Sequence, residues 1–336
     1  MADKEPIVTH VYTADPSAHV FNGKLYIYPS HDRETDIKDN DNGDQYDMAD
    51  YHVFSMDTVG GPVTDHGVVL RQEDVPWVSK QLWAPDAATK NGKYYLYFPA
   101  RDKEGIFRVG VAVGDKPEGP FTPEPDYIKG SFSIDPATFV DDDGSAYLFF
   151  GGIWGGQLQN WATGKFDKSG EEPTSGDALS AKVGKLTEDM TQFASEVTDI
   201  LILDPETQKP IQAADHDRRF FEAAWLHKYN GKYYFSYSTG DTHFLCYAIG
   251  DSPVGPFTYG GRILEPVVGW TTHHSIAEFK GKWYLFYHDS TLSGGRNHLR
   301  CVKIREIVYD EQGKIGLAEP QPKLSEEDAP PAKLEA

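Results

Sequence analysis

The chain has very few cysteines and no long apolar run. Only Cys246 and Cys301 occur among its 336 residues, and each lies in an apolar, strand-like stretch. Such positions are typical of buried free thiols and exclude a small fold held by disulfides. No stretch approaches the length of a membrane span, and no apolar run follows a basic start. We therefore expect a cytoplasmic protein with no membrane partner.

Basic residues are also scarce. The chain has 32 Lys and Arg against 52 Asp and Glu, which gives a net charge of −20. Nucleic-acid binding needs clustered basic side chains, and an anionic membrane surface attracts them too, so both classes of partner are excluded. A neutral carbohydrate does not respond to net charge and stays open as a substrate. No feature of the sequence indicates an obligate protein partner.

Aromatic residues, glycine and proline are abundant, with 19 Tyr, 18 Phe, 7 Trp, 32 Gly and 22 Pro. This composition favours strands and tight turns over helices. One phrase, a glycine-centred turn followed by aromatic strand residues, occurs five times. Its turns are Asn22-Gly23, Asn91-Gly92, Asp143-Gly144, Asn230-Gly231 and Lys280-Gly281. Asn-Gly and Asp-Gly are strong hairpin signals, so the phrase predicts five β-hairpins.

A second phrase, Gly-Pro-Phe-Thr, follows two of these copies at 119–122 and 255–258, each time after a third strand-like run. The repeating unit is therefore a hairpin, a third strand, a Gly-Pro turn and a fourth strand. A four-stranded propeller blade needs roughly 40–50 residues. Two of the intervals between turns are much longer, which predicts insertions near 33–50 and 155–215.

These repeats predict an all-β, five-bladed β-propeller over residues 1–318, followed by a flexible tail, 319–336, rich in Pro, Glu and Lys. A β-sandwich with similar hairpins is the alternative architecture. A sandwich rarely repeats one phrase five times, so the propeller is favoured.

An ionisable residue precedes each turn by six to nine positions, where the channel-lining strand of a blade begins; the five are Asp15, Asp86, Asp135, Glu222 and His274. Charged side chains are rarely buried without partners, so several of them along one channel indicate a catalytic site. Burial and like charge separate the pKa values of such groups into an acid and a base, as glycoside hydrolysis requires. We assign Asp86 a structural role, as a bond acceptor at a strand end.

With these motifs the chain resembles glycoside hydrolase family 43, of the five-bladed propeller clan, from about Val8 to Tyr309. The motifs occur in the family's order: Ala14-Asp15-Pro16, Trp83-Ala84-Pro85-Asp86, Ile134-Asp135-Pro136 and Phe221-Glu222-Ala223. The resemblance implies that Asp15 is the general base that activates water and that Glu222 is the general acid. It implies that Asp135 tunes the pKa of the acid and orients it, and that the mechanism is inverting.

The resemblance also implies a pocket lining. Trp83 would stack on the sugar, with Ile134 beside it, and Arg296 would hold sugar hydroxyls. The alternative for Arg296 is an ordinary surface-loop arginine. His31 would close the pocket, and Trp154, in a glycine-rich insertion, would be a lid residue or simply part of loop packing.

His274 is the candidate metal ligand. Family members often hold a calcium ion near a channel histidine, so the resemblance implies calcium here, bound largely through water because calcium prefers oxygen. The alternative is a neutral histidine bonded to substrate or to Glu222. The run from Asp39 to Asp44 resembles an acidic calcium loop, but Asp50 stands where the twelfth-position Glu belongs, so we interpret it as a solvated insertion loop.

The function expected from these features is an exo-acting β-D-xylosidase with α-L-arabinofuranosidase activity on oligosaccharides. An endo-arabinanase is the alternative enzyme, but it needs an open groove, whereas the long insertions predict a blocked pocket. A fructan-cleaving relative is disfavoured because Ile134 stands where those enzymes carry Arg. A propeller lectin is the non-catalytic alternative, and it would not need three carboxylates in one phase of the repeat.

Overall fold

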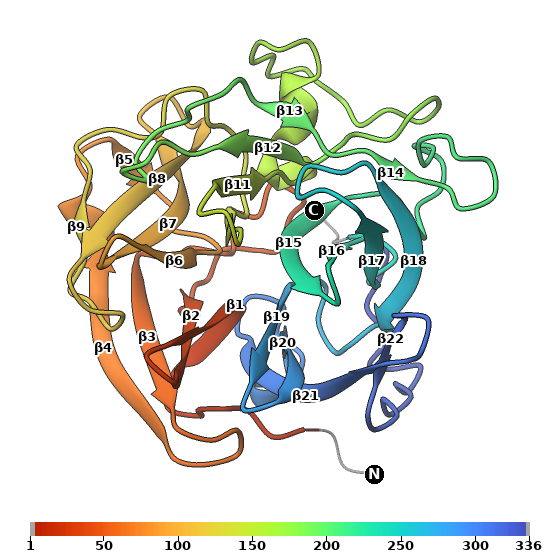
Figure 1. The fold of residues 1–336 in the computed structure, drawn as a ribbon. Helices are drawn as coiled ribbons and strands as arrows, with labels where there is room; N and C mark the ends of the chain where they lie inside the picture. The colour runs from red at the N-terminus through yellow and green to blue at the C-terminus, as the bar shows by residue number, and fades with distance from the viewer. Residues whose placement is uncertain (1–3, 334–336) are drawn as a thin grey trace.

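Five β-sheets surround a central axis in the computed structural model, which describes residues 4–333 (Figure 1). The first blade consists of β1 (Tyr12–Phe21), β2 (Lys24–Asp32), β3 (Asp50–Met56) and β4 (Val63–Arg71). The second consists of β5 (Val78–Lys80), β6 (Asp86–Lys90), β7 (Lys93–Asp102), β8 (Phe107–Gly114) and β9 (Thr122–Pro123). The third consists of β10 (Ala137–Val140), β11 (Ala146–Phe150), β12 (Lys182–Lys185) and β13 (Thr198–Asp199).

The fourth blade consists of β15 (Glu222–Tyr229), β16 (Lys232–Ser238), β17 (Leu245–Gly250) and β18 (Phe257–Leu264), with β14 (Ile202–Leu203) added parallel to β18. The fifth consists of β19 (His274–Phe279), β20 (Lys282–Asp289), β21 (Cys301–Tyr309) and β22 (Ile315–Leu317). Within residues 4–333 the only helices are single 3₁₀ turns: η1 (Gln72–Asp74), η2 (Trp154–Gly156), η3 (Leu158–Trp161) and η4 (Thr291–Ser293). The predicted five-bladed propeller is confirmed.

Each repeated glycine turn joins the first and second strands of a blade, as predicted. In the first blade Asn22 and Gly23 have φ of 53° and 77°. Positive φ at both central residues is the type I′ geometry that matches the twist of a two-residue hairpin. Asn and Gly tolerate this conformation, which is why the turn could be read from the sequence.

The first strands of the blades form a closed ring, because each of β1, β6, β10, β15 and β19 contacts the next, and β19 contacts β1. The seam between the last and first blades is also hydrogen-bonded. The Ile7 N–H donates to the Val302 carbonyl at 2.9 Å, and the Thr13 N–H donates to the Arg300 carbonyl at 3.0 Å. The start of the chain thus pairs with β21 and completes the ring.

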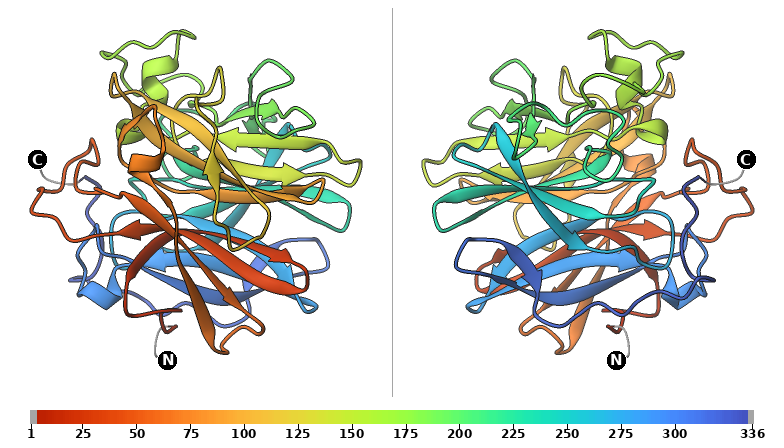
Figure 2. Two further views of the ribbon diagram at one scale, coloured as in Figure 1. Left: turned by 90° about the vertical axis from the view of Figure 1, so that its left-hand side faces the viewer. Right: turned by 90° about the vertical axis from the view of Figure 1, so that its right-hand side faces the viewer.

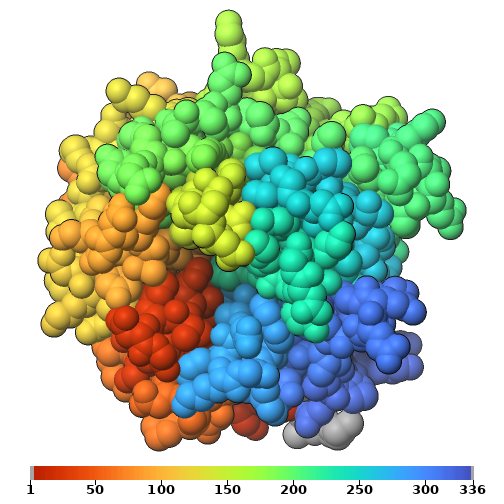
Figure 3. Space-filling model, viewed as in Figure 1, coloured from red at the N-terminus to blue at the C-terminus, as the bar shows by residue number. Residues whose placement is uncertain are grey.

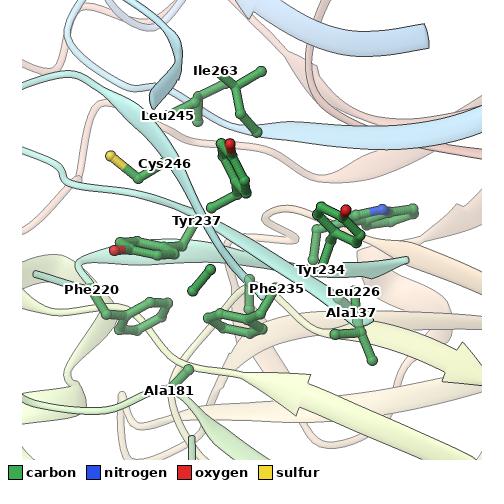
Figure 4. Packing of buried hydrophobic residues seen from close by; sticks show 14 of the residues in the cluster. Ala137, Ala181, Phe220, Leu226, Tyr234, Phe235, Tyr237, Leu245, Cys246 and Ile263 are labelled. Carbon is green, nitrogen blue, oxygen red and sulfur yellow. The ribbon is translucent and has the colours of Figure 1, made fainter. Parts of the chain in front are cut away.

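The core lies between neighbouring blades and is rich in aromatic rings. Figure 4 shows part of its largest cluster, in which Phe220, Phe235 and Tyr237 pack with Leu245 from the next strand. Phe121 and Phe257, from the repeated Gly-Pro-Phe-Thr phrase, are also buried. The phrase therefore recurs because each copy places one ring in the packing around the outer strands. Cys246 and Cys301 are buried and free, as expected.

Long loops gather on one side of the disc. Residues 33–49 and 151–181 contain no strand, which agrees with the insertion predicted near 33–50. The insertion predicted near 155–215 was too long, because that range also contains β12 and β13 of the third blade and β14. Figure 2 shows the 33–49 loop, in red, at one end of the molecule, whereas the hairpin turns lie at the opposite end. Figure 3 views the hairpin face, where the five blades surround a central hollow. No helix within residues 4–333 is long and apolar enough to cross a membrane.

The segment after β22 runs along the body without forming a strand. The Gln321 side chain donates to the carbonyls of Glu265 at 2.9 Å and Pro266 at 3.0 Å. Further on, the Pro331 carbonyl lies 3.2 Å from Nε2 of His243. The flexibility of this tail stays a prediction.

Asp86 ties three inner strands together, which supports its structural role. Its fully buried carboxylate accepts hydrogen bonds from Nε2 of His19 at 2.6 Å and from the Thr138 backbone N–H. We predict that Asp86→Ala lowers the free energy of unfolding by about 2–4 kcal/mol, because it leaves a buried donor unpaired. Urea denaturation measures this.

The matched control is Asp251→Ala, which removes an aspartate from an exposed ion pair with Lys232. Its cost should stay below about 1 kcal/mol. Equal losses in the two variants would contradict the structural role of Asp86.

Candidate active site

A cavity of about 600 Å³, counted with its open mouth, lies at the ends of the inner strands opposite the hairpin turns. All three predicted catalytic carboxylates line it. The lining also includes aromatic and polar groups from the inserted loops and from the fifth blade: Asn40, Asp41, Tyr46, Trp83, Ile134, Trp154, Phe221, Trp270, Thr271, His273 and Arg300. The structure thus brings together side chains that lie far apart in the sequence.

Irregular backbone aims each carboxylate into the cavity. The pairing of β1 with β2 shifts register between Ala14 and Ser17, and that of β15 with β16 shifts between Glu222 and Trp225. Asp15 and Asp135 have φ of 48° and 56°. Left-handed backbone is uncommon outside glycine and gathers at functional sites. The bulges turn side chains that would otherwise alternate across the sheet towards one point.

Asp15 is held by donors on both oxygens. The Ser30 hydroxyl donates to Oδ2 at 2.5 Å, and Nη1 of Arg300 donates to Oδ1 at 3.1 Å. Burial alone would raise the pKa of Asp15. The positive charge of Arg300, with smaller contributions from His288, His273 and the Ser30 hydrogen bond, outweighs burial and lowers this pKa to about 2. Asp15 is therefore ionised at neutral pH, as a general base must be.

Arg300 has a full set of partners. Its Nε and Nη2 donate to Asp32 at 2.8 Å each, and its backbone N–H donates to the same carboxylate at 2.9 Å. Nη1 also donates to Thr271 Oγ1 at 3.1 Å, and the guanidinium lies 4.8 Å from the centre of the Tyr46 ring. This bidentate arrangement fixes the arginine that sets the charge state of Asp15.

Glu222 and Asp135 form a coupled acidic pair. Burial, then the charge of Asp15, raises the pKa of Glu222 to about 8. Burial, then the charges of Glu222 and Asp15, raises the pKa of Asp135 as well. The Ala223 N–H donates to Oδ2 of Asp135 at 2.8 Å, which favours the ionised form there. The raised pKa of Glu222 keeps this carboxyl protonated at neutral pH, which is the state that a general acid needs.

Two histidines complete the polar end of the cavity. Nδ1 of His273 lies 3.6 Å from Asp15 and 3.7 Å from Asp135, which places the ring between the two aspartates. Burial lowers the pKa of His273 to about 4, so the ring is neutral at neutral pH. Nδ1 of His288 accepts the Asp15 backbone N–H at 2.9 Å and fixes the bulge. Burial lowers the pKa of His288 to about 3, which keeps this nitrogen an acceptor.

Three of the predicted substrate residues, Trp83, Ile134 and Trp154, line the cavity. Trp83 donates its Nε1–H to the Tyr46 carbonyl at 2.8 Å. Trp154 donates its Nε1–H to Glu172 at 2.9 Å, and Glu172 pairs with Arg219. Both indoles are therefore held in place.

The structure does not bring His31 or Arg296 to the cavity. His31 lies near the end of β2, with Nδ1 2.6 Å from Asp50. The Arg296 side chain is half exposed and lies 3.8 Å from Glu34. His274 is fully buried behind His273, and its Nε2 lies 2.6 Å from the Ser236 hydroxyl.

Sequence reasoning missed Arg300, His273 and Trp270. Arg300 carried a usable signal, because it begins an apolar, strand-like run with Cys301 and Val302. A basic residue in such a run must find a buried partner. His273 and Trp270 lie just before β19, in a loop that no pattern marked.

The loop from Asp39 to Asp44 is partly exposed, as predicted, but it also lines the pocket. Asn40 and Asp41 line the cavity, and a side chain on Gly43 would lie 2.6 Å from the Trp83 ring. A side chain on Gly155 would lie 2.8 Å from the Asn42 carbonyl. The insertions of the first and third blades therefore touch, backbone to backbone, and close one side of the cavity.

Comparisons with known proteins identify the fold's family. A model of glycosyl hydrolases family 43 matches residues 4–315. The chain belongs to glycoside hydrolase family 43. It is a glycoside hydrolase, as the resemblance implied. A curated relative from Humicola insolens, named xylosidase/arabinosidase 43A, is 73% identical over 325 residues, which are 94% of this chain and 99% of the relative.

Solved structures of family members match closely. The family 43 β-xylosidase/α-arabinofuranosidase from a compost microbial metagenome, in complex with xylotriose in a calcium-free form, is 61% identical with a TM-score of 0.92, covering 94% of this chain and 96% of that one. The GH43_1 enzyme from Xanthomonas citri complexed with xylose is 55% identical with a TM-score of 0.88, covering 93% and 92%. The whole propeller is thus shared with these enzymes.

The two catalytic pKa values predict the pH dependence of kcat/KM. Glu222 has a raised pKa, so the acid is present below about pH 8 and is lost as the pH rises through it. Asp15 has a lowered pKa, so the base is lost only as the pH falls towards about 2. We expect kcat/KM on a natural glycoside to fall roughly tenfold for each pH unit above the pKa of Glu222. Initial rates across pH measure the profile.

An activated aryl glycoside is the control substrate, because its leaving group needs little protonation. With this substrate, kcat/KM should fall much less steeply at high pH. A basic limb of equal steepness for both substrates would contradict the assignment of Glu222 as the acid.

Proposed function

We propose that this enzyme is an exo-acting, inverting β-D-xylosidase that also removes α-L-arabinofuranosyl groups, acting on xylo-oligosaccharides and arabinose side chains. The names of its relatives and the xylotriose and xylose complexes of its structural neighbours support this substrate class. The observation that carries the proposal is the pairing of an ionised Asp15 with a protonated Glu222 in one cavity.

In the proposed reaction Asp15 takes a proton from water as the water oxygen attacks the anomeric carbon. Glu222 gives its proton to the departing glycosidic oxygen while the bond from the anomeric carbon to that oxygen breaks. One water is consumed, and the two carboxyls end in exchanged protonation states. Asp135 accepts the hydrogen bond of the Ala223 N–H, next to the acid in the chain, and so helps to orient it. The tuning of the pKa of Glu222 by Asp135 stays a prediction.

The exo mode is supported by the contact between the loops of Asn42 and Gly155. An endo-arabinanase needs a groove through which a chain can run, whereas this contact blocks one side of the cavity. Trp83 and Ile134 offer an apolar wall to the C–H face of a sugar, and His273 and Thr271 offer polar groups to its hydroxyls. This combination of one apolar and one polar side is typical of a sugar pocket.

The anomer of the first product tests the inverting mechanism. With xylobiose we expect α-xylose to appear first, because water attacks the face opposite the leaving group. Proton NMR during early turnover measures this. Early β-xylose would contradict the role of Asp15 as a base. Internal cleavage of arabinan would favour the endo-arabinanase, and a complete absence of turnover would favour the non-catalytic lectin.

We also propose that His274 helps to bind calcium in the channel. Its Nδ1 is buried and has no hydrogen-bond partner within the described residues, and burial lowers the pKa of the ring well below its usual value. A neutral imidazole with an unused nitrogen fits a ligand role. Calcium prefers oxygen, so water and nearby hydroxyls would supply the remaining ligands, and the ion would add a positive charge behind the acidic site.

Chelation tests this ion. EDTA treatment should lower the melting temperature and the activity, and added calcium should restore both, because a ligand bound only by the folded state stabilises it. His274→Ala should lose the calcium response while weak binding to surface carboxylates persists. Unchanged melting and activity after chelation, with no metal found by elemental analysis, would count against the ion. The cytoplasmic location stays a prediction, which cell fractionation can test.

A further inference from the structure

A histidine–carboxylate cluster lies on the first blade, and none of its members lines the active-site cavity. It consists of His31 on β2, Asp50 and His52 on β3, Asp65 on β4, and His10 before β1. One potential ligand atom from each of His31, Asp50 and His52 lies within 4.8 Å of the other two. We call these five residues the blade 1 cluster.

Hydrogen bonds order the cluster in pairs. Nδ1 of His31 lies 2.6 Å from Asp50, and Nδ1 of His52 lies 3.0 Å from Asp65. Nε2 of His10 also lies within hydrogen-bond distance of the Asp65 carboxylate, at 2.8 Å. A carboxylate on one ring nitrogen fixes the orientation of an imidazole and raises the basicity of the other nitrogen, as in many metal sites.

The unbonded nitrogens are accessible. Within residues 4–333, Nε2 of His31 and Nε2 of His52 make no hydrogen bond, and the two rings lie 4.8 Å apart between centres. The side chains of His31, Asp50 and His52 are 13–23% exposed. An ion can therefore reach them from solvent.

We propose that the blade 1 cluster binds one zinc-class divalent cation through His31, Asp50 and His52. Two imidazoles with one carboxylate suit zinc, cobalt or nickel better than calcium, which prefers oxygen. Ligands of a single zinc ion lie at most about 4.4 Å apart, so the three side chains must move closer together. In this complex the ion would replace the proton between Nδ1 of His31 and Asp50, and both atoms would bind it. Asp65 and His10 support the site from outside the ligand set.

Such an ion would join β2 to β3 and, through Asp65 and His10, would reach β4 and the segment that pairs with the fifth blade. Its main effect would be on the stability of the propeller seam. The site is independent of the proposed catalytic function and of the calcium ion proposed at His274, because neither shares a residue with it.

Zinc titration calorimetry of the tag-free full-length chain, in excess calcium to occupy weak carboxylate sites, tests the proposal. We expect one equivalent of zinc and a rise in melting temperature, and cobalt in place of zinc should give a visible absorption band. His31→Gln and His52→Gln should each weaken zinc binding by at least about tenfold, and Asp65→Asn roughly 10–100-fold.

The matched control is His66→Gln, which removes a histidine on the same blade that bonds Ser55 at 2.8 Å and lies outside the cluster. It should leave zinc affinity unchanged, and circular dichroism checks that each variant is folded. Unchanged affinity in His31→Gln and His52→Gln would overturn the proposal, as would an absence of stoichiometric binding. Loss of the zinc site in His274→Ala alone would place the ion in the channel and overturn it too.

Discussion

Arg300 connects the closure of the propeller to the chemistry of its site. Its guanidinium lies at the seam between the fifth and first blades and donates to Asp32 and Asp15, while its carbonyl accepts the Thr13 N–H. A buried arginine is tolerable only when its donors have partners, and apart from Thr271 those partners lie on the first blade. The position of this blade and the ionised state of Asp15 therefore depend on the same set of contacts.

Backbone irregularity is the second requirement of the site. In a regular strand, neighbouring side chains point to opposite faces, so the inner strands alone would not converge three carboxylates on one point. The shifts in register at Asp15 and Glu222 and the left-handed φ of Asp15 and Asp135 solve this locally. Such conformations cost about 1–3 kcal/mol each and persist only where the surroundings fix them. His288 and the Ala223 N–H do so here.

The features that repeat could be predicted from the sequence, and the features that occur once could not. The hairpin turns and the phase of Asp15, Asp135 and Glu222 recur in each blade, so five weak signals reinforced one another. Arg296 and Arg300 lie four residues apart in a loop that has no counterpart elsewhere, and only the tertiary fold decides which one reaches Asp15. The contribution of the 39–44 loop to the pocket was missed for a similar reason, because its acidic sequence does not reveal that Gly43 packs on Trp83.

The contact between Asn42 and Gly155 also restricts how a sugar chain can enter and leave the site. In the proposed exo mode a chain does not run past the catalytic carboxylates on that side, and it approaches end-on and withdraws after a bond is broken. The released sugar, which lies deeper than the remaining chain, leaves through the opening by which the chain entered. Cleavage is then distributive rather than processive, and a sugar that lingers in the cavity competes directly with the next chain end.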